Sequence, residues 1–260
     1  MSIFNRTTVM SFLLFWYLTS ITQLLIAISG SASFEGFKDA TITALLWLIP
    51  ILLFPKHVKK ITGSLGLLVW LFALPGFGYF LIYRQELTQS LMFIIFESNK
   101  SESTEYFQNY FSIRIVLGFL LFTAVPIFIW SRIKPAKVIK NASYLPIVLI
   151  ASLVFLSPVT KAIQQRDIAA AKASINRHMG VAPPWQLAFG YSNYQNELAV
   201  VERNLLNFNQ IAPLTNLKEV KKALPTTVVI VIGESTTRVH MGLYGYPRDT
   251  NPKLSSIKMS

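Results

Sequence analysis

The stretch TTVVIVIGESTTRVHMGLYGYPRDTNPKL, residues 226–254, decides how the carboxyl-terminal part of the chain is interpreted. It opens with the apolar run Val228–Ile232, and a short run rich in β-branched residues predicts a strand buried on both faces, as in a parallel sheet. Gly233 and Glu234 follow at the carboxyl end of this strand, where open α/β sheets place their ligand-binding residues. We therefore expect the first strand of an α/β domain, with a carboxylate at its end.

The composition of the whole chain indicates membrane segments. Of its 260 residues, 52% are hydrophobic and 13% are aromatic, which exceeds the average of soluble globular proteins. The formal net charge is +12, but the basic residues form no tail and the aromatic residues do not alternate with arginines. A nucleic-acid partner is therefore not expected. The chain contains no cysteine, which excludes disulfides and thiolate metal sites.

Five uncharged apolar runs precede residue 161, and a spanning helix needs about 20 residues. The runs are Val9–Ser29, Ala40–Pro55, Ile61–Tyr83, Ile115–Ser131 and Asn141–Thr160. The first run lacks a convincing cleavage site for a signal peptidase, so we interpret it as a retained anchor. The sequence predicts a five-helix transmembrane domain over residues 1–160.

The charges of the connecting segments predict the orientation. If the amino terminus is cytoplasmic, the inner segments contain eight basic residues and no acid. These are Arg6, Lys56, Lys59, Lys60, Arg132, Lys134, Lys137 and Lys140. The outer segments contain more acids than bases, so the positive-inside rule supports this orientation. The odd number of spans then places the residues after Thr160 on the outer side.

The longest connection between spans, residues 84–114, contains a candidate interfacial helix followed by a polar, Glu-rich turn. Its apolar side would be formed by Leu91, Ile94, Ile95 and Phe96. Two interpretations remain open: this helix lies on the bilayer surface, or the polar residues after it face a lipid head group. Those polar residues are Glu97, Ser98, Asn99 and Glu102. Carboxylates beside a membrane suit a cationic head group such as an ammonium.

Residues 161–225 are predicted to form helices that bridge the membrane domain and the α/β segment. A helical pattern follows Thr160 and is interrupted at Gly180 and at Pro183-Pro184, and a second pattern covers Asn196–Asn209. Residues 226–260 would then begin the α/β domain.

The local pattern around Glu234 leaves its role open between metal ligand, acid–base group and charged cap. The hydroxyl residues of 235–237 lack the G-x-S-x-G spacing of a nucleophile elbow, and we interpret them as caps of a following helix. His240 has no second histidine or aspartate at ligand spacing, so we assign it a structural role.

GESTTRVHMGLYGYPRDTNP, residues 233–252, resembles the opening motif of the phosphoethanolamine transferases of Gram-negative inner membranes. This family belongs to the alkaline phosphatase and sulfatase-like superfamily, and its pattern is G-E-S-x-x-R, then L-Y-G-Y, then R-D-T-x-P. The five spans and the outward-facing carboxyl-terminal part also fit, so the resemblance covers essentially the whole chain. It implies the amino-terminal portion of an enzyme that modifies lipopolysaccharide core sugars or lipid A, with a truncated sulfatase-like domain.

The resemblance implies roles for three residues. Glu234 matches an acidic ligand of the catalytic zinc, and Ser98 and Glu102 match two positions that contact the donor's ethanolamine head. A third contact, an asparagine in the family, corresponds to Ile94 here. The family's nucleophilic threonine and an Asp-His pair of the zinc site lie beyond these residues, so no catalytic residue is assigned in this chain.

The resemblance also implies the partners and the mechanism. In a complete relative, a zinc-activated threonine attacks phosphatidylethanolamine, and lipopolysaccharide then accepts the phosphoethanolamine group. The chain would lie in the inner membrane with its carboxyl-terminal part in the periplasm. We expect the 260 residues alone to be inactive, since a catalytic zinc usually has three protein ligands. Two alternatives remain: a non-enzymatic membrane anchor or lipid-binding remnant of a disrupted gene, and another sulfatase-like phosphoglycerol transferase.

Overall fold

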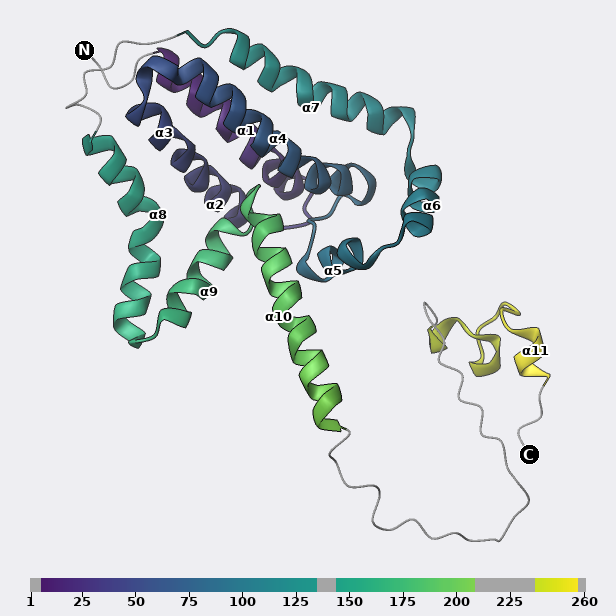
Figure 1. The fold of residues 1–260 in the computed structure, drawn as a ribbon. Helices are drawn as coiled ribbons and strands as arrows, with labels where there is room; N and C mark the ends of the chain where they lie inside the picture. The colour runs from purple at the N-terminus through teal and green to yellow at the C-terminus, as the bar shows by residue number, and fades with distance from the viewer. Residues whose placement is uncertain (1–5, 135–143, 209–236, 257–260) are drawn as a thin grey trace. The chain divides into compact units, whose positions relative to one another are not determined.

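The computed structural model describes residues 6–134, 144–208 and 237–256 (Figure 1). The chain divides into two compact units, Met1–Asn209 and Gln210–Ser260, and each is described by itself. Within the described ranges the regular structure is helical and contains no strand. The strand expected at Val228–Ile232, like Glu234, lies outside these ranges, so the α/β part of the predicted fold remains a prediction.

The larger unit contains five helical stretches that are long and apolar enough to cross a membrane, counted over the described residues. This number agrees with the five spans predicted from the sequence. The stretches are Arg6–Ile28 (α1), Phe34–Leu53 (α2 Phe34–Ala44, η1 Leu45–Trp47, α3 Leu48–Leu53), Pro55–Tyr83 (η2 Pro55–His57, α4 Val58–Tyr83), Ile113–Ser131 (α7) and Tyr144–Gln165 (α8).

The second and fifth spans extend beyond the predicted apolar runs. The second begins at Phe34 rather than Ala40 because Ser33 caps it, its side chain accepting a hydrogen bond from the Glu35 backbone N–H at 3.4 Å. The fifth continues past Thr160 to Gln165. Charged and polar residues mark where an apolar run ends, but they do not end a helix that continues outside the bilayer.

The core of the bundle lies where α1 meets α4 and α7. Phe15 of α1 is fully buried, and Phe77 of α4 stacks on Phe122 of α7 with ring centroids 4.3 Å apart. Gly118 allows α7 to approach α4 closely, since a Cβ atom there would lie 2.7 Å from Leu81 Cδ1. Such packing matters because helices in a bilayer associate through close contact rather than through water exclusion.

The outer faces of α7 and α8 carry many exposed apolar side chains. Examples are Leu117, Leu120, Leu121, Ile127, Leu145, Val148, Leu149 and Leu153. In water such a surface would be unfavourable, whereas lipid acyl chains would solvate it. The exposure therefore agrees with a multi-pass membrane protein.

One end of the bundle gathers the basic connecting segments. Thr7 Oγ1, at the start of α1, donates a hydrogen bond to the Lys134 carbonyl at 2.9 Å. Trp130 Nε1, near the end of α7, donates to the Lys59 carbonyl at 3.0 Å. The segments before α4 and after α7 therefore lie at the amino-terminal end of α1, as the predicted topology requires. Which compartment this end faces remains a prediction.

The opposite end of the bundle is tied together by Gln23, which is only 5% exposed. Its Nε2 atom donates to Glu86 Oε1 at 2.8 Å and to the Val181 carbonyl at 3.1 Å. Ser31 Oγ, just after α1, donates to the Arg84 carbonyl at 2.6 Å. The end of α1 therefore contacts the segment after α4. It also contacts the turn between two later helices, α9 (Ile168–Met179) and α10 (Trp185–Phe208).

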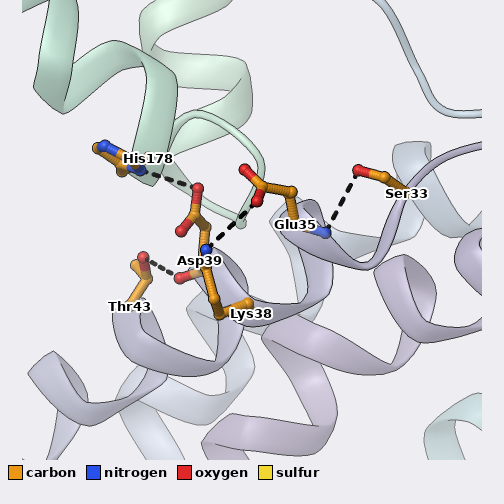
Figure 2. A network of polar contacts seen from close by, with 6 residues as sticks. All are labelled: Ser33, Glu35, Lys38, Asp39, Thr43 and His178. Carbon is orange, nitrogen blue, oxygen red and sulfur yellow. Dashed lines mark hydrogen bonds and ion pairs between the residues drawn. The ribbon is translucent and has the colours of Figure 1, made fainter.

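Helices α9 and α10 occupy part of the region predicted to bridge the two parts of the chain. Asp167 caps α9 by accepting from the Ala169 backbone N–H at 2.8 Å. Helix α9 is joined to α2 by His178, whose Nδ1 atom lies 2.9 Å from Asp39 Oδ2 (Figure 2). Helix α10 begins at Trp185, well before the predicted Asn196. The α9–α10 hairpin packs on the bundle through His178 and through the Val181 carbonyl, which accepts from Gln23.

Candidate functional site

The segment that follows α4 forms two short helices, α5 (Gln89–Glu97) and α6 (Lys100–Tyr110). Helix α5 is the expected apolar helix. The prediction of a polar turn after it was wrong, because Asn99 and Glu102 form a capping box that starts a helix. The Asn99 side chain accepts from the Glu102 backbone N–H at 3.0 Å, and Glu102 Oε2 accepts from the Asn99 backbone N–H at 3.2 Å.

The two predicted head-group residues lie on either side of this junction. Ser98 directly follows α5, and its hydroxyl donates to the Ile94 carbonyl at 2.7 Å. Glu102 lies in the first turn of α6, where its Oε1 atom also accepts from Asn99 Nδ2 at 2.8 Å. A carboxylate has about four lone-pair sites, so the exposed Glu102 group retains acceptor capacity. Their contact with a head group remains a prediction.

Helix α5 is held against α10 by aromatic contacts. The ring of Phe96 lies 5.4 Å from that of Tyr191 and 5.6 Å from that of Tyr194, between centroids. Met92 is 5% exposed, and a Cβ atom added to Gly190 would collide with its sulfur. The α5–α6 junction is therefore positioned by α10.

The other side of α5 and much of α6 remain uncovered. Ile94 and Ile95 are exposed, as is Phe107 of α6. Tyr110 of α6 lies against Tyr83 at the end of α4, with centroids 5.7 Å apart, and a hydrogen bond with Tyr83 raises the pKa of the Tyr110 hydroxyl. Aromatic residues of this kind are enriched at membrane–water interfaces.

In the smaller unit, the described residues are 237–256. They include most of the motif at residues 233–252, but Gly233, Glu234 and Ser235 lie outside them. Thr250 Oγ1 donates to the His240 carbonyl at 2.7 Å and accepts from the Gly242 backbone N–H at 3.0 Å. Asn251 Oδ1 accepts from the Leu243 backbone N–H at 3.1 Å. The R-D-T-x-P and L-Y-G-Y pieces therefore fold onto each other, which gives their fixed spacing a structural reason.

Single residues of this unit also have local roles. Gly245 has φ +94°, a conformation that favours glycine. The His240 ring packs edge-on against Tyr246 with centroids 5.2 Å apart. The Arg238 guanidinium lies 4.6 Å from the centroid of Tyr244. These contacts give the motif residues Arg238, His240 and Gly245 a structural role within the smaller unit.

The two remaining expectations for this region have different outcomes. Thr237 precedes a 3₁₀ turn, η4 (Arg238–His240), but its side chain makes no capping hydrogen bond, so the capping role expected for this hydroxyl was wrong. A single 3₁₀ turn leaves fewer free N–H groups than an α-helix. Among the described residues, no three His, Cys, Asp or Glu side chains form a metal-binding group. Zinc therefore remains a proposal that depends on Glu234.

Comparison with known proteins gives relatives along nearly the whole chain. It is 37% identical over 247 residues to phosphoethanolamine transferase EptC of Escherichia coli strain K12, covering 94% of this chain and 43% of that protein. Phosphoethanolamine transferase CptA of Salmonella typhimurium strain LT2 is 35% identical over the same shares.

A Kdo(2)-lipid A phosphoethanolamine 7''-transferase of Salmonella typhimurium is 27% identical over 84% of this chain and 40% of its own length. No family model matches the chain, and no solved structure matches it. The chain thus spans less than half the length of its curated relatives. By this similarity the chain is related, along nearly its whole length, to part of the phosphoethanolamine transferases.

Proposed function

We propose that the chain supplies the membrane-embedded, donor-binding part of an inner-membrane phosphoethanolamine transferase. Such an enzyme moves phosphoethanolamine from phosphatidylethanolamine to lipopolysaccharide, at a core sugar or lipid A. The observation that carries this proposal is the similarity to named phosphoethanolamine transferases along nearly the whole chain. The five apolar helices, with basic segments gathered at one end, support an inner-membrane protein whose amino terminus is cytoplasmic.

The α5–α6 junction is the proposed contact with the donor. The Glu102 carboxylate would accept hydrogen bonds from the ammonium of the ethanolamine head. The Ser98 hydroxyl, which donates to the Ile94 carbonyl in the structure, would turn to donate to the adjoining phosphate. The capping box restricts the Glu102 side chain, and the packing of Phe96 on α10 holds the junction in place. A restricted carboxylate loses less conformational entropy when it binds a ligand.

Zinc, when bound, would polarise the phosphoryl group, and Glu234 is proposed as one of its ligands. The described residues offer no group of three ligands for this ion. A catalytic zinc usually has three protein ligands, and Glu234 alone would not hold the metal firmly. We therefore propose that these 260 residues do not transfer phosphoethanolamine by themselves.

A chimera tests the proposed function. This chain replaces the matching region of the E. coli K12 relative, in a strain that lacks its own copy, and mass spectrometry of lipopolysaccharide detects added phosphoethanolamine. The expected result is transfer by the chimera, none by the 260 residues alone, and none after Glu234→Gln. A chimera that reaches the membrane in normal amount but gives no transfer would overturn the proposal. The non-enzymatic alternative would then be preferred if the chain still bound lipid.

A further inference from the structure

A cavity of about 340 Å³ lies between the start of α5 and the α9–α10 hairpin. This volume is at the lower end of the range for small-molecule sites. Ser98 and Glu102 do not line it. Its polar lining residues are Glu86, Thr88, Asn176, Arg177, Gln186 and Asn193. The cavity therefore combines one carboxylate, one guanidinium and several neutral hydrogen-bonding groups.

Glu86 supplies the negative charge of this cavity. Its Oε1 atom accepts a hydrogen bond from Gln23 Nε2 at 2.8 Å, and because Gln23 is buried this bond fixes the carboxylate. Glu35 pairs with Lys38 and Asp39 pairs with His178, and neither of these ion pairs includes Glu86. Glu86 therefore has a neutral hydrogen-bond donor but no cation within 4.0 Å among the described residues.

Arg177 supplies the positive charge from another element, the last turn of α9. It belongs to neither of the two ion pairs, so the guanidinium and the Glu86 carboxylate line one cavity without neutralising each other. An arginine fork binds phosphate oxygens well, and the amide group of Asn176 in the same lining can donate to an anion. Opposite charges held apart in this way complement a zwitterion.

We propose that this cavity binds the ethanolamine phosphate ester of a phospholipid, as a head-group subsite separate from the α5–α6 junction. Glu86 accepts from the ammonium, while Arg177 donates to the phosphate. The segment that carries Glu86 directly follows the span that ends at Tyr83, which is the depth at which lipid head groups lie. The choice of ethanolamine rests on the proposed function, whereas the choice of a zwitterion rests on the two charges.

Lipid binding to charge-neutralised variants tests this proposal. Glu86→Gln keeps an oxygen that accepts from Gln23, and Arg177→Gln removes the guanidinium. Glu202→Gln and Arg203→Gln, both exposed on α10, are the matched controls. Native mass spectrometry of the full chain measures the binding of short-chain phosphatidylethanolamine, of phosphatidylglycerol and of soluble phosphoethanolamine. Circular dichroism checks that each variant retains its helices.

We expect both cavity variants to bind phosphatidylethanolamine about three- to tenfold more weakly, because each loses one partly exposed charge contact. The two control variants should bind it like the parent chain. Weaker binding of soluble phosphoethanolamine in the cavity variants also supports the site. Equal binding in all variants would overturn the proposal. So would a loss of phosphatidylglycerol binding in Arg177→Gln alone, since the cavity would then bind anions only. Transfer by the chimera is scored separately, so either proposal can fail while the other stands.

Discussion

Removal of the Phe96 ring should release α5 from α10. Phe96 makes two ring contacts, with Tyr191 and Tyr194, and an aromatic pair contributes about 0.5–1.5 kcal/mol beyond area burial. Phe96→Ala should therefore cost about 1–3 kcal/mol of docking free energy, which raises the equilibrium constant for local opening about 5- to 150-fold. Helix α5 has only 9 residues, and isolated helices of that length are marginal in water. Undocking should therefore also unfold it.

Hydrogen–deuterium exchange of the chain in lipid nanodiscs measures this opening. Amides of α5 should exchange faster in Phe96→Ala by about the same factor, while those of α7 should not change. Phe107→Ala is the matched control, because this ring on α6 is 62% exposed and its ring contacts are with Tyr106 and Phe111. Unchanged exchange of α5 in Phe96→Ala would show that the aromatic contacts do not hold the junction, and the argument for a positioned site would fail.

Further predictions concern the two ends of the bundle. Because the chain has no cysteine, single cysteines report topology: a membrane-impermeant maleimide added from the periplasmic side should label Ser103→Cys and not Lys60→Cys, and the reverse result would invert the orientation. Gln23→Leu should lower the free energy of unfolding by about 1–3 kcal/mol, because it leaves the Glu86 carboxylate and the Val181 carbonyl without their donor. A thermal melt in detergent compares it with Gln195→Leu on the exposed face of α10, which should melt like the parent chain.

The five spans could be predicted because a bilayer demands long apolar helices whatever their neighbours are. Their limits were less predictable, since Ser33 starts α2 outside the apolar run. The capping box of Asn99 and Glu102 was present in the sequence as N-x-x-E, yet the surrounding polar residues suggested a turn. At α10, aromatic and small residues between Trp185 and Gly190 obscured the helical period, because that stretch contacts two different elements. Trp185 stacks on Trp47 of η1, whereas Gly190 lies against Met92 of α5.

Contacts between distant segments could not be predicted from local patterns. Gln23 within an apolar span did offer a signal, since polar residues there usually have a partner, but nothing identified Glu86 or the Val181 carbonyl. Asp39 and His178 are 139 residues apart in the chain, and no periodicity connects them (Figure 2). Such pairs depend on how the helices pack.

The charge of Glu102 gives the most direct test of the central claim, that the α5–α6 junction recognises the donor. Glu102→Gln keeps the capping box, because glutamine also serves at that position, and removes only the negative charge. In the active chimera, phosphoethanolamine transfer is measured at varied phosphatidylethanolamine concentration, with Glu105→Gln on the same helix as the control. An exposed charge contact predicts a KM about two- to fivefold higher with little change in kcat. An unchanged KM in Glu102→Gln, or an equal rise in Glu105→Gln, would contradict the claim.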